Sequence, residues 1–113
     1  MNLNIKRVAG LVREYERIDH ILRSQGFTCK KLSPPVYDIR LQDNISGRNY
    51  RLRIPTKSHN DHHVASPLLL QLGTPTIDRP RGNIPDSIIE AANQVLAEIV
   101  SYLLPNPPTL PSI

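Results

Sequence analysis

The chain contains one cluster of side chains of the types that bind metal ions. His59, Asp61, His62 and His63 place three imidazoles and a carboxylate within five residues. These groups are ligands for Zn²⁺, Ni²⁺ or Cu²⁺. However, the surrounding sequence is typical of a turn, and the adjacent His62 and His63 do not easily bind one ion together. We therefore expect a solvated, slightly basic loop, no metal site and no cofactor, with His59, His62 and His63 as the remaining ligand candidates.

Two arginines, Arg79 and Arg81, lie shortly before a helix that we expect to begin near Pro85. The free N–H groups and the dipole of a helix N-terminus attract anions, so these arginines could hold a phosphate or a carboxylate. The chain has no glycine-rich nucleotide-binding motif, and Asp86 and Ser87 would occupy much of the same terminus. An ordinary capped loop is the alternative to an anion site here.

A β-hairpin is the clearest local pattern. Two segments of alternating apolar and polar residues flank Asp43-Asn44-Ile45-Ser46-Gly47, which is typical of a turn. The apolar positions are Tyr37, Ile39, Leu41, Tyr50, Leu52 and Ile54. Two registers keep these six on one face. One sets Asp38 opposite Arg53, and Arg40 opposite Arg51. The other sets Arg40 opposite Arg53 and leaves Asp38 without a base, so we expect the first.

The hairpin would then carry an outward strip of Arg40, Arg51 and Arg53, with Arg48 near the turn and Asp38 as counter-charge. If no helix covers it, this strip is a candidate surface for an acidic partner or an anion. The alternative is a solvated sheet face whose charges discourage edge-to-edge aggregation.

No residues mark a catalytic centre. Cys29 is the single cysteine, and neither a base nor an oxyanion hole is marked for it, so we expect a small, partly buried residue. The ten acidic residues are scattered, with no paired carboxylates. We expect no enzymatic activity. The C-terminal Pro105-x-x-Pro108 and Pro108-x-x-Pro111 have the spacing read by polyproline-binding grooves, although extended tails of this composition are common.

Composition bounds the class of protein. The 113 residues suit one domain and carry a net charge of +4. Aromatic residues are scarce, with no Trp and one Phe, so the core should be aliphatic. The small net positive charge and the scarcity of aromatic rings that could stack on bases argue against nucleic-acid binding. No apolar run approaches the ~20 residues that span a bilayer, and none resembles a signal peptide, so we expect a cytoplasmic protein away from membranes.

The remaining periodicity predicts the other elements. Apolar residues at three- and four-residue steps predict a helix from about Val8 to Gly26; a short strand at 11–15 before a helix from Arg17 is the alternative. A basic connector follows, and Pro55 should close the hairpin. Residues 68–72 predict a strand buried on both faces, and 77–84 a loop.

Pro85 and a Ser87-x-x-Glu90 capping box predict a last helix that ends before Pro105. This order predicts an α+β fold. An antiparallel sheet, made of the hairpin and at least one further strand, would pack with an N-terminal and a C-terminal helix. We expect residues 1–104 to form a single domain and residues 105–113 a proline-rich flexible tail.

Several segments resemble the YugN-like family, small proteins of Bacillus-type bacteria. They are Ile18-Asp19-x-Ile21-Leu22-x-x-x-Gly26-Phe27, Tyr37-Asp38-Ile39-Arg40-Leu41, Tyr50-Arg51-Leu52-Arg53-Ile54-Pro55 and the Ile84-Pro85 that opens the closing helix. The resemblance covers most of residues 8–104. It implies a fold and a bacterial cytoplasm, and it implies no activity and no site residues.

Taken together, these patterns favour a non-enzymatic interaction or structural protein with a protein partner or self-association. The alternative is a small-anion or ligand-binding module that uses an arginine-lined surface, with Arg40, Arg51, Arg53, Arg79 and Arg81 as its candidates. A nucleic-acid-associated protein is a third, less favoured class.

Overall fold

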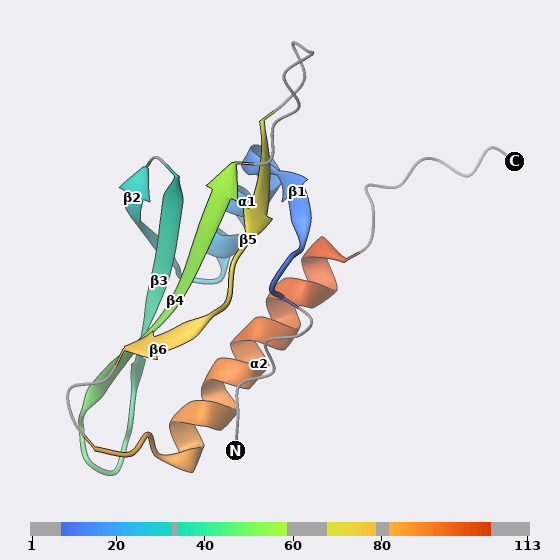
Figure 1. Ribbon diagram of the computed structural model, residues 1–113. Coiled ribbons are helices and arrows are strands. Elements are labelled where there is room, and N and C mark those ends of the chain that lie inside the picture. Colours follow the sequence, from blue (N-terminus) through green and yellow to red (C-terminus); the bar gives the residue numbers. More distant parts are fainter. Residues whose placement is uncertain (1–7, 33, 59–67, 79–81, 105–113) are drawn as a thin grey trace, which may run out of the picture.

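The computed structural model describes residues 8–32, 34–58, 68–78 and 82–104. Within these ranges the chain forms a six-stranded antiparallel sheet and two helices, which confirms the expected α+β fold (Figure 1). Along the sheet the strands run in the order β1-β5-β4-β3-β2, and β6 also pairs with β4. The elements are β1 (Val12–Glu14), α1 (Tyr15–Ser24), β2 (Thr28–Leu32), β3 (Pro35–Gln42), β4 (Asn49–Ser58), β5 (Leu69–Leu72), β6 (Thr76–Asp78) and α2 (Asp86–Leu103).

The hairpin of β3 and β4 has the expected register. Asp38 lies opposite Arg53, and Arg40 lies opposite Arg51. Its apolar side chains all point to the face on which the helices pack, because side chains alternate along a strand. The core is one aliphatic cluster with single Tyr and Phe members: Val8, Ile18, Leu22, Phe27, Tyr37, Leu52, Ile54, Leu70, Leu72, Ala92, Leu96, Ile99, Val100 and Leu103.

Pro55 does not end the hairpin, contrary to expectation, because β4 continues to Ser58. The Pro55 carbonyl accepts a hydrogen bond from the Gly73 N–H at 2.7 Å, so the proline nitrogen, which carries no hydrogen, faces the same neighbour. At this point the pairing along β4 shifts by one residue, from Thr56 opposite Leu72 to Arg53 opposite Thr76. This β-bulge separates β5 from β6 and tolerates a proline inside the sheet.

The N-terminal segment differs from the favoured prediction. Residues 8–10 form a turn, Gly10 has a φ of 92°, and the strand β1 precedes the helix. The alternative of a strand followed by a helix was the correct one, because β1 gains backbone partners along β5 that a helix would forgo. Gly26 ends α1 as expected, with a φ of 100° and a Phe27 N–H bonded to the Leu22 carbonyl.

Two further strands form where the sequence predicted irregular chain. The basic connector contains β2, which pairs with β3, and the expected loop at 77–84 contains β6, which pairs with β4. Both are short and polar, so their partners rather than their own pattern determine their conformation. The strand at 68–72 is present, but only Leu70 and Leu72 are fully buried, so one of its faces is open.

Helix α2 begins after Pro85 as predicted, but the capping box does not form. The Ser87 hydroxyl instead donates to the Asp43 carboxylate at 3.3 Å, which ties the hairpin turn to the start of the helix. Hydrogen bonds from Ser46, and the one from Ser87, lower the pKa of the Asp43 carboxyl.

The C-terminal end of α2 is capped by side chains that are distant in the sequence. The Arg13 guanidinium donates to the Leu103 and Leu104 carbonyls at 2.6 and 2.8 Å, and Arg17 donates to the Tyr102 carbonyl at 2.9 Å. These carbonyls have no partner within the helix, and positive charge at a helix C-terminus is favourable. Both arginines therefore stabilise the contact between α2 and the β1–α1 segment.

Ile99→Asp should lower the free energy of unfolding by about 3 kcal/mol or more, because Ile99 is fully buried and a carboxylate there would lose its water without a partner. Ala97→Asp is the matched control, since Ala97 is exposed on the same helix and the change should cost less than about 1 kcal/mol, the helix-propensity difference included. Urea unfolding of both variants tests this. Similar losses in the two would show that this face of α2 is not the core face.

Candidate functional site

The sheet face opposite the helices is the main surface on which the sequence-predicted arginines meet. No described element packs over it. The outward positions of β4 are Arg51, Arg53, Pro55 and Lys57, which follow one another at two-residue steps. Arg40 projects from the neighbouring β3 directly opposite Arg51. The three hairpin arginines are therefore brought together as predicted.

Asp38 lies within this group, and its side chain is 0% exposed. Arg51 Nη1 is 3.2 Å from Asp38 Oδ1, and Arg53 Nη2 is 3.8 Å from Asp38 Oδ2. The two arginine side chains remain 44% and 41% exposed, so they shield the carboxylate while keeping contact with water. The predicted register placed Asp38 opposite Arg53; in the structure Asp38 forms ion pairs with both Arg51 and Arg53.

Arg53 also meets a second acid, Asp78 of β6, at 3.4 Å. Sequence reasoning missed this pair because β6 was expected to be a loop. Arg40 differs from both of its neighbours. It is exposed, and among the described residues it has neither a hydrogen bond nor an ion pair through its side chain. Of the three strip arginines, Arg40 is therefore the one whose charge is available to a partner.

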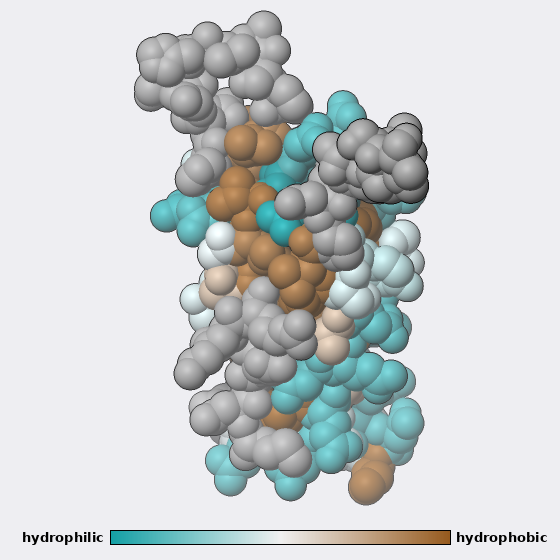
Figure 2. Space-filling view, turned by 90° about the vertical axis from the view of Figure 1, so that its right-hand side faces the viewer, coloured by the Kyte–Doolittle hydropathy of each residue, from teal (hydrophilic) through white to brown (hydrophobic). Residues whose placement is uncertain are grey.

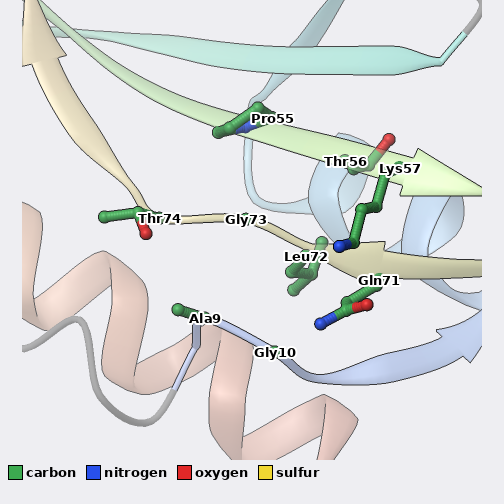
Figure 3. Close-up of a pocket in the computed structure, with 9 residues that line it drawn as sticks. All are labelled: Ala9, Gly10, Pro55, Thr56, Lys57, Gln71, Leu72, Gly73 and Thr74. Carbon is green, nitrogen blue, oxygen red and sulfur yellow. The ribbon is translucent and has the colours of Figure 1, made fainter.

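A hollow lies at the far end of the same face, where β4, the bulge and the start of β1 meet (Figure 3). Its volume is about 560 Å³, and it is lined by residues 9–10, 55–57 and 71–74. Lys57 and Gln71 are cross-strand neighbours on its rim. The sequence did not mark these residues, because Gly10, Gly73 and Lys57 come from three distant segments whose pairing no local pattern predicts.

Several other sequence-predicted site residues lie outside the described part of the chain: Arg79, Arg81, His59, His62 and His63, and the proline-rich tail. Within the described ranges no three His, Cys, Asp or Glu side chains could hold a metal ion together. Cys29 is half-buried, opposite Tyr37 on β3. The Tyr37 hydroxyl donates to Asp19 at 2.7 Å, and burial and this bond raise the pKa of the phenol.

An apolar area is visible on the side that carries β1 and the C-terminal end of α2 (Figure 2). Among the described residues, Leu68, Tyr102 and Leu104 expose 40%, 53% and 44% of their surface. No helix in the described part of the chain is long and apolar enough to cross a bilayer.

Asp38→Asn should lower the free energy of unfolding by about 2 kcal/mol, the scale of a charge-assisted hydrogen bond, because Arg51 and Arg53 would lose their shared counter-charge. Asp78→Asn is the control. Asp78 is 64% exposed, so its pair with Arg53 should contribute less than about 0.5 kcal/mol. Denaturant unfolding measures both, and an equal effect of the two substitutions would contradict a central role for Asp38.

The sequence matches no protein-family model and no curated protein. In three dimensions the chain is similar to an uncharacterised conserved protein, YugN from Geobacillus kaustophilus HTA426, with a TM-score of 0.69 and 22% sequence identity. The alignment covers 82% of this chain and 85% of that chain. The resemblance to the YugN-like family that the sequence motifs indicated is therefore confirmed at the level of the fold.

Proposed function

We propose that this protein is a non-enzymatic interaction protein whose uncovered sheet face binds an acidic surface of a partner protein. The observation that carries the proposal is the placement of Arg40. It lies opposite Arg51, a like-charge pair that costs stability, and it has no acidic partner among the described residues. An acidic side chain of a partner would relieve that repulsion.

The distribution of charge supports a protein partner more than a nucleic acid. Arg51 and Arg53 are held by Asp38, and Arg53 is also held by Asp78. Of the three strip arginines only Arg40 is therefore unpaired, whereas a nucleic-acid backbone presents a phosphate every few ångströms and is bound by clustered charge. A protein surface with a few carboxylates fits the arrangement better. We further propose a bacterial cytoplasmic location; the similarity to a Geobacillus protein supports the bacterial part of this proposal.

The two paired arginines also determine how the proposal must be tested. Replacing Arg51 and Arg53 alone would leave the buried Asp38 carboxylate without a counter-charge, which is strongly destabilising. Loss of binding could then reflect unfolding. Arg40 is exposed and unpaired, so Arg40→Gln and Arg40→Glu should fold normally.

Binding to immobilised poly-L-glutamate tests the proposal. The unmodified protein should bind, Arg40→Gln should elute at lower salt, and Arg40→Glu should elute lower still, because each step removes favourable charge from the proposed contact. Arg23→Gln is the matched control. It removes the same charge from α1, where Arg23 pairs with Asp19 at 3.0 Å, and it should elute like the unmodified protein.

A variant in which Asp38→Asn accompanies Gln at positions 40, 51 and 53 should lose binding and keep its fold, because it leaves no buried acid unpaired. Elution of the Arg40 variants together with the Arg23 control would refute the proposal. Stronger binding to duplex DNA than to poly-L-glutamate, with a steep dependence on salt, would assign the face to nucleic acid instead.

A further inference from the structure

The hollow on the outer sheet face has a physical cause in three neighbouring residues. Gly73 lies between β4 and β1: its N–H donates to the Pro55 carbonyl at 2.7 Å, and the adjacent Leu72 carbonyl accepts from the Gly10 N–H at 2.8 Å. Gly10, Pro55 and Gly73 share the outward direction of Lys57 and Gln71. Because two of the three are glycines, no side chain fills the space above the sheet here.

The glycine at position 73 is required by the close approach of Pro55. A Cβ atom there would lie 3.0 Å from Pro55 Cγ and 3.3 Å from the Pro55 carbonyl oxygen. Gly10 has a φ of 92°, a conformation that residues with a side chain rarely adopt. The hollow is thus fixed by backbone geometry at the bulge and does not depend on the rotamer of a movable side chain.

The polar groups at the rim determine the charge of a suitable ligand. In Figure 3 the Lys57 amino group extends from β4 toward β5, and the Gln71 amide extends from β5 toward Gly10, so both groups border the hollow. Lys57 is exposed, and no described group forms an ion pair or a hydrogen bond with its side chain. The amide can also donate, and the Thr74 hydroxyl is a further donor at the other end of the hollow. None of the lining residues is acidic.

The volume determines the size of the ligand. A hollow of about 560 Å³ falls within the roughly 300–1,000 Å³ of sites for organic ligands. A bare inorganic ion would fill only a small part of it, since one water accounts for about 30 Å³. The Pro55 ring and the Ala9 methyl group provide apolar surface beside the polar rim.

We propose that this hollow is a binding site for a small organic anion, with its carboxylate or phosphate group on Lys57 and Gln71 and its uncharged body against Pro55 and Ala9. The site is separate from the acidic-partner surface proposed above. Arg53, the nearest outward cation along β4, is already engaged by Asp38 and Asp78, so Lys57 provides the charge that recognises the anion.

Amide chemical shifts of the full-length protein, titrated with three probes at constant ionic strength, test the site. Benzoate and phenyl phosphate combine a ring with a carboxylate or a phosphate, and benzyl alcohol is the uncharged control. At least one of the two anions should produce saturable shifts at Gly10, Lys57 and Gly73, and benzyl alcohol should not. The anion with the lower dissociation constant identifies the group that the site prefers.

Lys57→Gln should raise the dissociation constant of the preferred anion by about tenfold, the effect of losing one charge-assisted hydrogen bond. Lys57 is exposed, so the variant should keep the dispersed spectrum of the folded protein. Arg40→Gln is the control from the same face and should not change the constant. This control also separates the two proposals, because Arg40→Gln weakens poly-L-glutamate binding and leaves the hollow intact.

The proposal is overturned if neither anion produces saturable shifts at the hollow. It is also overturned if benzyl alcohol binds as well as the anions, or if Lys57→Gln binds the preferred anion as tightly as the unmodified protein.

Discussion

Pro55 lies inside a strand that pairs along both edges, and the rest of the sheet depends on how that proline is accommodated. On one edge β4 pairs with β3 from Val36 to Gln42. On the other edge the proline nitrogen has no hydrogen to donate, so a continuous partner strand would lose a ladder bond there. The extra residue between β5 and β6 accommodates the missing hydrogen bond. Before it, β5 pairs with β4 on one edge and with β1 on the other; after it, β6 pairs with β4, where Asp78 lies 3.4 Å from Arg53.

The helices are tied to this sheet at both ends of α2 by polar contacts, and between those ends by aliphatic packing. At its first turn Ser87 bonds to Asp43 of the hairpin turn, and at its last turn Arg13 and Arg17 bond to the terminal carbonyls. These contacts join residues more than 40 positions apart, so they depend on the tertiary fold and not on local structure. They also explain why some charged residues of this basic chain serve the fold and are not available to a partner.

Local patterns predicted the parts of the structure whose own residues determine them. The alternation of the hairpin and its charges fixed the pairing of Asp38 with Arg53, and the apolar stripe and prolines fixed the extent of α2. The segments that were missed, β2 and β6, are short and polar and become strands because a neighbour offers them a free edge. The same limit applies to the sites. The arginine strip lies within one hairpin and was predictable, whereas the hollow brings together Gly10, Lys57 and Gly73 from three distant segments.

The burial of Asp38 decides where charge remains available on the outer face. Together with Asp78, it compensates the charges of the two central arginines, and the unpaired cations at the two ends of this row are Arg40 on β3 and Lys57 beyond the bulge on β4. A uniformly basic strip would attract any polyanion. Two separated charges, one on an open sheet face and one beside a hollow with apolar walls, instead favour two kinds of ligand that can be tested independently. In the binding scheme proposed above, the acid at the centre of the face contributes selectivity as well as stability.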